Sequence, residues 1–446
     1  MKSVDPRQAC AFRFVRVKYD EGEAQLVYAF DDGAELIERI GFPDSPVLSD
    51  KRKPAFDAAL RLLHLIAGVS YYKAGVPTEI RVEGAPLDVE TAQFMDAVYL
   101  HGLAEFAYQN KLDLRERIRF PRGAQKADLA PSLNLPRRTL VPIGGGKDSL
   151  VSVEMLKRVH EPMTAVWVGD SALIAACAQR SGLPLLNISR TLAPKLFEYN
   201  RMGAWNGHIP VTAINSAILL CAAILYGYDT IAFSNERSAS VATLEYDGQP
   251  VNHQWSKSRD FERTLREYTK SYIAADLDYF SLLRPWSELA VARMFACTAQ
   301  YDDVFSSCNR NFRIRGERPA DRWCGQCPKC HFVFLALSPF VAKTRLLAIF
   351  GRNLLDDATL ASGFDALLEY REHKPFECVG EGRESRAALF ALTHRPEWRE
   401  DALIARFAEE IVPQLDTHEL ALAPLLAPAG GHFLPLRLQA LLHAPV

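Results

Sequence analysis

The sequence predicts an α/β protein built around a parallel β-sheet. From Thr139 onward, near-continuous apolar segments alternate with helical patterns, as is typical of strands covered by helices on both faces. A glycine-rich turn, Gly144–Gly146, lies between the first of these segments and the helical pattern that follows. Ahead of this region, residues 12–40 are rich in β-forming residues between Asp-Glu-Gly and Asp-Asp-Gly turns, which predicts a β-meander.

The first part of the chain, residues 1–125, is expected to form a separate α+β domain with a role in substrate binding. The meander comprises runs at 12–19, 24–30 and 34–40. It is followed by a helical pattern over 54–75, a short strand over 79–83 and a helix over 88–109, for which Asp88 is a suitable N-cap. The polar segment 126–138, which carries Pro and Arg residues, is expected to be a linker.

The second part, residues 139–340, carries the predicted parallel sheet. Its expected strands are 139–143, 163–168, 183–188 and 230–234, with helices over 149–160, 171–181 and 211–227. Ligands of such sheets bind beyond the carboxyl ends of the strands. Gly144, Asp170 and the polar segment 234–240 all follow strand ends, which predicts that they share one site.

The last part, residues 341–446, is expected to be a helical extension. Helical patterns occur at 343–350, 364–371, 386–393 and 401–411. The tail from Leu420 is rich in Ala, Leu and Pro and is expected to pack against the rest of the protein.

Composition narrows the class of protein. A chain of 446 residues is long enough for two or three domains, and 48% hydrophobic with 24% charged residues is typical of globular proteins. The net charge of −2 argues against a dedicated nucleic-acid binder. The N-terminus has no apolar signal core, and the uncharged run 211–228 contains Thr212, Asn215 and Ser216. We therefore expect a cytoplasmic protein without a membrane span; the oligomeric state is not predicted.

The turn at Gly144 is the strongest functional signal. Glycines let the backbone approach a ligand, and the free N–H groups at a helix N-terminus attract anions, so the segment predicts a phosphate site. A flexible turn is the alternative. The order Gly-Gly-x-Asp-Ser resembles the PP-loop of the ATP pyrophosphatases, in which Ser usually stands at the position of Gly144. That resemblance implies a HUP-like domain that splits ATP into AMP and pyrophosphate. The expected ATP-binding residues are Gly144, Gly145, Gly146, Lys147, Asp148, Ser149 and Asp170.

Magnesium is the cofactor that ATP chemistry requires, because it offsets phosphate charge. Asp148 and Asp170 are its candidate ligands.

Four cysteines have the spacing of a metal site. Cys324, Cys327 and Cys330 form a C-x2-C-x2-C motif, with Cys308 upstream. Four thiolates suit structural Zn²⁺, while an iron–sulfur cluster or no metal are the alternatives. The PP-loop enzyme that makes 7-cyano-7-deazaguanine has a similar late cluster, although it lacks the large N-terminal part and the helical extension. The five other cysteines are read as small apolar residues: Cys10, Cys177, Cys221, Cys297 and Cys378.

Two polar segments supply further candidates, although solvated loops can have the same composition. The segments are 234–240 and 245–258. A further candidate segment, 200–208, includes His208. Candidates for catalysis, with the base left open, are Asp148, Glu236, His253 and Lys257; His208, and Cys308 if no metal binds, are further candidates for the base. Candidates for substrate binding are Asn235, Arg237, Asn252 and Arg259.

The combination of VPIGGGKDS, FSNERSAS, VNHQWSKS and WCGQCPKCHFVFLAL resembles the MurL-type UDP-N-acetylmuramoyl-L-alanyl-L-glutamate epimerases over most of the chain. The resemblance implies an ATP-dependent isomerase of peptidoglycan precursor synthesis. Its substrate would be a nucleotide-sugar dipeptide whose terminal L-Glu is inverted through adenylation, α-proton exchange and hydrolysis. Two alternatives stay open. One is another PP-loop enzyme, a ligase or a tRNA-modifying enzyme; the other is a nucleotide-binding protein without catalytic activity.

Overall fold

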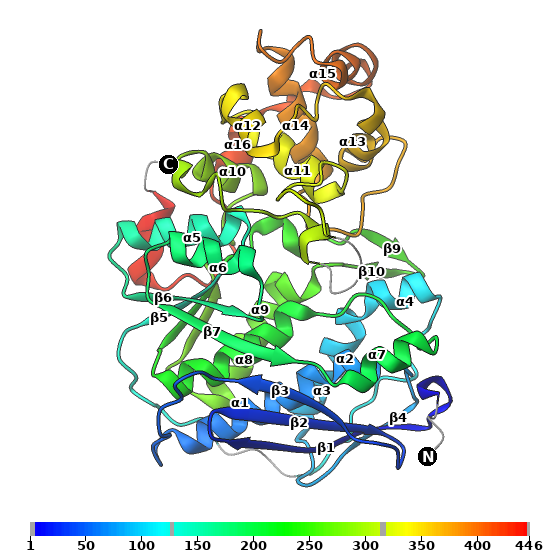
Figure 1. Cartoon of the computed structure of the whole chain (residues 1–446), viewed down its shortest axis with the longest axis vertical. Coiled ribbons are helices and arrows are strands. Elements are labelled where there is room, and N and C mark those ends of the chain that lie inside the picture. Colours follow the sequence, from blue (N-terminus) through cyan, green and yellow to red (C-terminus); the bar gives the residue numbers. More distant parts are fainter. Residues whose placement is uncertain (1–4, 125–128, 313–317, 444–446) are drawn as a thin grey trace.

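One large β-sheet organises the computed structural model, which describes residues 5–124, 129–312 and 318–443 (Figure 1). Its strands are β1 Ala11–Asp20, β2 Glu23–Phe30, β3 Leu36–Gly41, β4 Glu79–Val82, β5 Thr139–Pro142, β6 Met163–Val168, β7 Leu185–Thr191, β8 Thr230–Phe233 and β11 Asp278–Ser281. Within the described residues these nine strands lie in the order β11-β8-β5-β6-β7-β3-β2-β1-β4. A separate hairpin pairs β9 (Leu244–Tyr246) with β10 (Gln249–Val251).

The strands β11, β8, β5, β6 and β7 are parallel to one another, which confirms the predicted parallel sheet. Successive side chains on these strands point to opposite faces. Leu140 belongs to the core on one face, and the next residue, Val141, belongs to the core on the other. Both faces are covered by helices, and this explains why the central strands β5, β6 and β8 are apolar along most of their length.

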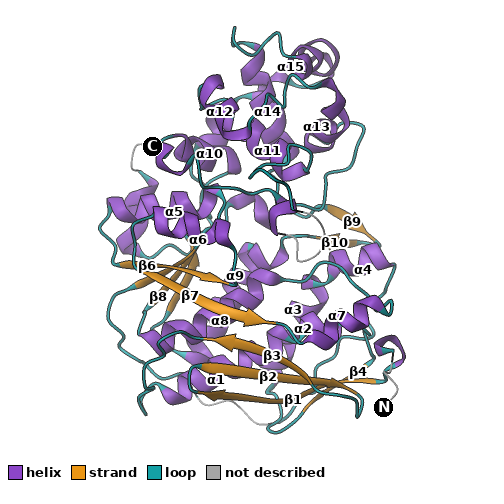
Figure 2. Cartoon of the chain, viewed as in Figure 1, coloured by secondary structure: helices purple, strands orange, loops and turns teal. Residues whose placement is uncertain are grey.

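Helices α5 (Lys147–Arg158), α6 (Ala172–Arg180) and α10 (Glu288–Ala296) contribute to the core on one face of the sheet. The other face packs on α1 (Lys53–Ala67) and α8 (Val211–Tyr226). Helices α7 (Pro194–Arg201) and α9 (Arg259–Tyr268) complete this part of the fold, and Figure 2 shows the helices on either side of the strands.

The N-terminal strands extend the same sheet. The predicted meander is confirmed, because β1 pairs with β2 and β2 with β3 in antiparallel register. Strand β3 also pairs antiparallel with β7, so that Ile40 lies opposite Arg190. Arg190 Nε donates to the buried carboxylate of Glu38 at 2.7 Å, which ties the two parts together. One sheet therefore continues across the expected linker 126–138, of which residues 126–128 lie outside the described residues.

The predicted helix over 54–75 is interrupted at Gly68. Helix α1 ends at Ala67, and α2 (Val69–Tyr72) follows directly. A Cβ at Gly68 would lie 2.5 Å from Phe14 Cε1, so only glycine lets the helix approach β1 this closely. Two further helices follow, α3 (Val89–Gly102) and α4 (Ala104–Asn110). Asp88 caps α3 as predicted, because its side chain accepts a hydrogen bond from the Thr91 amide at 2.8 Å.

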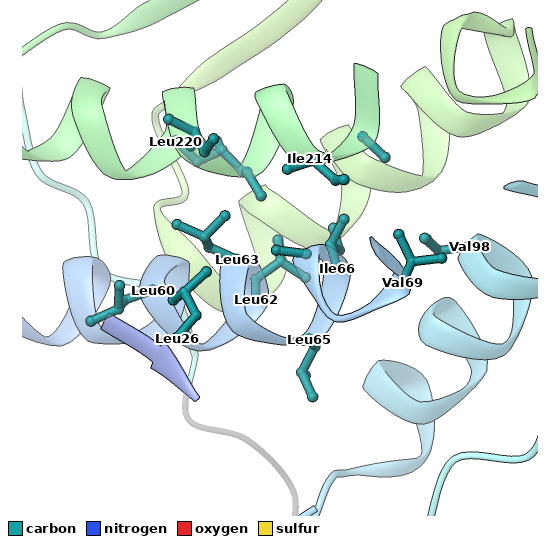
Figure 3. Close-up of a cluster of buried hydrophobic side chains, with 14 of the residues drawn as sticks. Leu26, Leu60, Leu62, Leu63, Leu65, Ile66, Val69, Val98, Ile214 and Leu220 are labelled. Carbon is teal, nitrogen blue, oxygen red and sulfur yellow. The ribbon is translucent and has the colours of Figure 1, made fainter. Parts of the chain in front are cut away.

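The uncharged run at 211–228 forms α8, a buried helix as predicted. Among the residues described, no helix combines the length and apolarity needed to cross a membrane. Figure 3 shows Ile214 and Leu220 of α8 facing Leu62, Leu63 and Ile66 of α1. All five side chains are fully or almost fully buried, so this contact joins the N-terminal helices to the sheet.

Leu63→Ala is expected to destabilise the protein by about 2–5 kcal/mol, because it leaves a cavity in a close-packed core. Leu63 is 0% exposed, whereas Leu436 is 85% exposed. Leu436→Ala is therefore the matched control and is expected to change stability by less than about 0.5 kcal/mol. Urea unfolding of both variants measures the difference; equal midpoints would contradict the packing described here.

The C-terminal helices lie at the opposite end of the molecule from β1 and β2 (Figure 1). They are α11 Pro328–Leu337, α12 Lys343–Phe350, α13 Ala361–Leu368, α14 Gly382–Thr393, α15 Ala402–Arg406 and α16 Leu422–Leu426. The tail returns to the sheet, where the Arg437 guanidinium donates to Thr230 Oγ1 at 2.9 Å and Leu438 is buried. The expectation that the tail packs against the protein is confirmed.

Candidate active site

The glycine loop lies where β5 ends and α5 begins. Gly145 has a φ of +81°, a left-handed conformation that favours glycine, and Gly146 is the N-cap of α5. The hydroxyl of Ser149 accepts a hydrogen bond from the Gly144 amide at 3.3 Å and donates to the Gly146 carbonyl at 3.2 Å. No side chain caps α5, so its first amides are available to an anion at the end of the strand.

The surroundings of the loop leave space on one side only. A Cβ at Gly144 would meet nothing within 4 Å, whereas one at Gly146 would lie 2.5 Å from Ser307 Oγ. The Ser306 amide donates to the Gly145 carbonyl at 2.9 Å, which holds the loop from the other side. The space beside Gly144 is open, so a serine side chain would also fit there.

The ammonium group of Lys147 forms ion pairs with carboxylates of the protein. Its side chain is 2% exposed, and its ammonium group pairs with Asp148 at 2.5 Å and with Glu288 of α10. Burial opposes the charge of Lys147, but the two carboxylates outweigh it and raise its pKa. Lys147 therefore braces the loop from inside the protein, while the Asp148 carboxylate remains 32% exposed.

The polar segment after β8 is held in place by buried hydrogen bonds. The Asn235 amide donates to Ser281 Oγ at 2.9 Å, and the Glu236 carboxylate accepts from Ser238 Oγ at 2.7 Å. Burial raises the pKa of Glu236, and the carboxylates of Glu384 and Asp148 raise it further. Arg237 is half-buried, and its guanidinium pairs with no other residue in the described part of the chain.

A histidine pair lies where α4 meets the segment after β10. His253 Nδ1 hydrogen-bonds the Glu105 carboxylate, and the His253 and His208 rings are 4.2 Å apart. Burial opposes protonation of His253, but Cys378 and Glu105 outweigh it and raise its pKa to about 9. Burial and the neighbouring His253 lower the pKa of His208 to about 3. One ring is therefore charged at neutral pH and the other is neutral.

Cys378 completes this cluster, contrary to its reading as a small apolar residue. Lys257 Nζ donates to Cys378 Sγ at 3.1 Å, and His253 lies close enough to act electrostatically on the same sulfur. Burial opposes ionisation of the thiol, but Lys257, His253 and Lys329 outweigh it and hold its pKa well below the usual range. The fields of Asp148 and Glu236 also act on Lys257, so the cluster lies beside the glycine loop.

Three other predicted site residues either lie apart from this cluster or hydrogen-bond nearby backbone: Asn252, Arg259 and Asp170. Asn252 closes its own turn, accepting from the Gln254 amide at 2.7 Å and donating to Ala239 O at 3.1 Å. Arg259 Nε donates to the Gly431 carbonyl at 2.6 Å, which directs its side chain to the C-terminal tail. Asp170 is exposed just beyond the carboxyl end of β6.

The four cysteines of the motif come together. Among their sulfurs, Cys324–Cys330 are 3.7 Å apart, Cys327–Cys330 3.5 Å and Cys327–Cys308 4.0 Å. Four sulfurs at about 2.3 Å from a zinc ion would be about 3.8 Å from one another, so the group fits a tetrahedral metal. The cluster also adjoins the loop, because Ser306, which holds Gly145, accepts a hydrogen bond from the Cys308 amide at 3.1 Å.

Several residues of this site were not expected from the sequence. Lys329 lies between two cysteines of the metal-site motif, so nothing in the sequence indicates a separate role for it. In the structure its charge acts on Asp148 and Cys378. Glu105 and Glu288 lie on helices far from the glycine loop in sequence, and only the fold brings them near. No spacing pattern marks Cys378.

A cavity of about 380 Å³ opens between α4 and the β9–β10 hairpin. Tyr108 and Tyr246 meet at its wall with ring centroids 5.0 Å apart, and Lys111 and Arg115 also line it. Tyr108 contacts Phe376, two residues before Cys378, at 5.5 Å between ring centroids. The cavity therefore adjoins the histidine and cysteine cluster.

Comparison with known proteins identifies the family. The model of the MurL N-terminal domain matches residues 3–282, and that of the MurL C-terminal domain matches residues 304–422. The chain is 59% identical over 438 residues to a UDP-N-acetyl-alpha-D-muramoyl-L-alanyl-L-glutamate epimerase of Xanthomonas oryzae pv. oryzae (strain MAFF 311018), covering 98% of this chain and 97% of the relative.

Proteins of the same name in two other bacteria are more distant. The identity is 42% over 443 residues with Salinispora tropica, covering 97% of this chain and 95% of the relative. It is 41% over 442 residues with a Micromonospora species, covering 96% of this chain and 97% of the relative. The chain therefore belongs to the MurL family of UDP-N-acetyl-alpha-D-muramoyl-L-alanyl-L-glutamate epimerases.

Proposed function

We propose that the protein inverts the terminal L-Glu of UDP-N-acetylmuramoyl-L-Ala-L-Glu to D-Glu, with ATP split to AMP and pyrophosphate. The reaction would supply D-Glu to peptidoglycan precursors. Near-complete coverage of relatives that carry the epimerase name supports the substrate. The observation that carries the ATP-dependent route is the glycine loop, which joins a parallel strand to an uncapped helix N-terminus beside Asp148.

The sheet supports the assignment of residues 139–340 to a PP-loop domain of HUP-like fold. Five strands run parallel, and the loop follows one of the three inner strands of this set, β5. In such sheets the carboxyl ends of the strands form the ligand site. The open space beside Gly144 supports binding of the ATP phosphates there.

Activation of a carboxylate explains why an epimerase would consume ATP. The Cα–H of a free amino-acid carboxylate is a very weak acid, because its removal adds a second negative charge. Adenylation removes the first charge and makes the carbonyl electron-withdrawing, so that a side-chain base can take the proton. Return of a proton to the opposite face inverts the centre, and hydrolysis then releases the D-Glu product and AMP.

The residues of the loop have distinct roles in this proposal. The amides at Gly145 and Gly146 would stabilise charge as pyrophosphate leaves, while Lys147 holds the loop by pairing with Glu288. Asp148, with Asp170 near it in the proposal, would hold Mg²⁺, which offsets phosphate charge when bound. Asp170 is exposed just beyond the carboxyl end of β6, the strand that pairs with β5, and this supports its role beside Asp148.

The cysteine cluster is assigned to structural zinc. Its four sulfurs leave no open ligand position in a tetrahedral site, which is the arrangement of structural rather than catalytic zinc. Held in this way, Cys308 would fix Ser306 and therefore the carbonyl of Gly145.

The cavity between α4 and the β9–β10 hairpin is the proposed place for the nucleotide end of the substrate. Tyr108 and Tyr246 offer ring faces for a base, and Lys111 offers charge for phosphates. Tyr108→Ala is expected to raise the KM for the UDP-linked dipeptide about tenfold, the loss of one stacking contact. Steady-state kinetics would measure it, and an unchanged KM for ATP is the internal control; equal effects on both substrates would contradict this assignment.

The loop itself can be tested with two matched glycine substitutions. Gly144→Ser is expected to retain AMP formation within about threefold, because a side chain there meets open space. Gly145→Ala forces a φ of +81° on a residue with a Cβ, at a cost of about 1–3 kcal/mol, and is expected to raise the KM for ATP. Similar kinetics for the two variants would argue against this loop as the ATP site.

Incubation with ATP, Mg²⁺ and the UDP-linked dipeptide in heavy water tests the function. We expect AMP, pyrophosphate, solvent deuterium at the glutamate Cα and D-Glu after hydrolysis. AMP without deuterium would instead indicate a ligase, and salt-dependent binding of tRNA would indicate a tRNA-modifying enzyme. Binding of ATP with no AMP formed would indicate a nucleotide-binding protein.

A further inference from the structure

Cys378 belongs to a cluster of four side chains that come from three separate segments. Glu105 lies on α4, His253 and Lys257 follow β10 in successive turns, and Cys378 lies between α13 and α14. His253 hydrogen-bonds Glu105 and acts electrostatically on Cys378, so the three form a carboxylate–imidazole–thiol series. Such a series orients an imidazole and stabilises a thiolate beside it.

The cations around Cys378 favour the thiolate. The groups that act on it are Lys257, with its Nζ at 3.1 Å from the sulfur, His253 and Lys329, while Glu377 opposes them. Cys378 is half-buried, whereas Cys177 and Cys221 are 0% exposed. Cys378 is therefore a partly exposed residue with a cation 3.1 Å from its sulfur, which is the setting of a reactive thiol.

The cluster faces the place where the proposed activation would occur. Lys257 and Lys329 each act on Asp148 of the glycine loop as well as on Cys378. Lys257, which donates to Cys378 Sγ at 3.1 Å, therefore lies between the sulfur and the loop where the carboxylate would be activated. Three of the predicted candidates are less suitable as the base: Lys257 and His253 are protonated, and Glu236 accepts a hydrogen bond from Ser238.

We propose that Cys378 is the base that removes the α-proton of the activated glutamyl residue, with Lys257, His253 and Glu105 as its positioning residues. This inference rests on the proposed function. The thiolate takes the Cα proton and becomes a thiol, while the C–H electron pair moves into the acyl group as an enolate. A second acid delivers a proton to the opposite face. After product release the thiol loses its proton to solvent and the second acid regains one, so that no net proton is consumed by the inversion.

The test is the full chain with Cys378→Ala, incubated with ATP, Mg²⁺ and the UDP-linked dipeptide in heavy water. We expect AMP formation to continue while deuterium at Cα and D-Glu both fall by about 10²–10⁴-fold, the contribution of a general base. Cys297→Ser, at an exposed cysteine, is the matched control and is expected to behave as the parent protein.

Two outcomes would overturn the inference. One is deuterium exchange by the Cys378→Ala variant at more than a tenth of the parent rate. The other is a thioester between Cys378 and the substrate, seen by mass spectrometry after acid quenching, which would make the sulfur a nucleophile. A parent protein that forms neither AMP nor D-Glu would instead contradict the proposed function itself.

Alkylation of the parent protein gives a second test that does not depend on folding of the variant. Iodoacetamide at pH 6.5 is expected to label Cys378 before the exposed Cys10 and Cys297, and ATP with the dipeptide should protect it. Lys257→Met should slow this labelling because it removes the nearest positive charge. Labelling of Cys378 no faster than that of Cys10 would overturn the inference.

Discussion

Asp148→Asn is expected to lower the rate of AMP formation by about 10²–10³-fold, the effect of removing one charged group from an electrostatic site. Burial opposes ionisation of Asp148, but Lys147, Lys329 and Lys257 outweigh it and lower its pKa. The side chain is therefore an anion throughout the neutral range, and Asn removes its charge while keeping its shape. In the proposed reaction that charge holds Mg²⁺ against the ATP phosphates.

Quenched-flow measurement of AMP gives the rate, and circular dichroism checks that the variant is folded. Asp303→Asn is the control, because Asp303 is 67% exposed and pairs only with Arg180 among the residues described. A folded Asp148→Asn protein with the AMP rate of the parent would remove the glycine loop from the mechanism.

Cys327→Ser is expected to have the largest effect on stability, lowering it by several kcal/mol. Cys327 is buried at the N-terminus of α11, and its sulfur lies within 4.0 Å of those of Cys308 and Cys330. The binding energy of a structural metal is folding energy, so loss of one ligand weakens the whole helical region. Turnover per folded molecule should fall much less, because the four sulfurs hold the metal and the Ser306 contact joins them to the glycine loop only indirectly.

Thermal unfolding and elemental analysis measure the two parts of this prediction. The parent protein should contain about one zinc per chain, and the variant should lose the metal. Cys297→Ser, at an exposed cysteine, should retain both metal and stability. Iron in place of zinc, or equal stability of the Cys327 and Cys297 variants, would contradict a structural zinc site.

The sequence predicted the local elements well because local signals specify them. Alternating strands and helices after Thr139 have the periodicity that a parallel sheet requires, and Asp88 has the side chain that caps a helix. The pairing of β3 with β7 was not predicted, because it joins residues about 150 positions apart and depends on register alone. Strand β11 was also not predicted, although it pairs in parallel with β8 at the edge of the sheet.

The residues of the candidate site also fall into those that the sequence predicted and those that only the fold brings together. The glycine loop and the cysteine motif have characteristic spacing, so their residues were found in the sequence. Cys378, Glu105 and Glu288 have no such spacing, and their chemistry arises only when Lys257, His253 and Lys147 are packed beside them. Arg259 shows the converse, since a cation near a polar motif is used to hold the C-terminal tail.

The central claim is that ATP activates the glutamyl carboxylate. Transfer of a labelled oxygen from that carboxylate to AMP tests it most directly. The UDP-linked dipeptide would carry ¹⁸O in the α-carboxylate of its terminal glutamate. Adenylation followed by attack of water on the acyl carbon leaves one labelled oxygen on the phosphate of AMP, and the account predicts AMP enriched by one ¹⁸O per D-Glu formed. D-Glu produced with unlabelled AMP, or without any AMP, would contradict it.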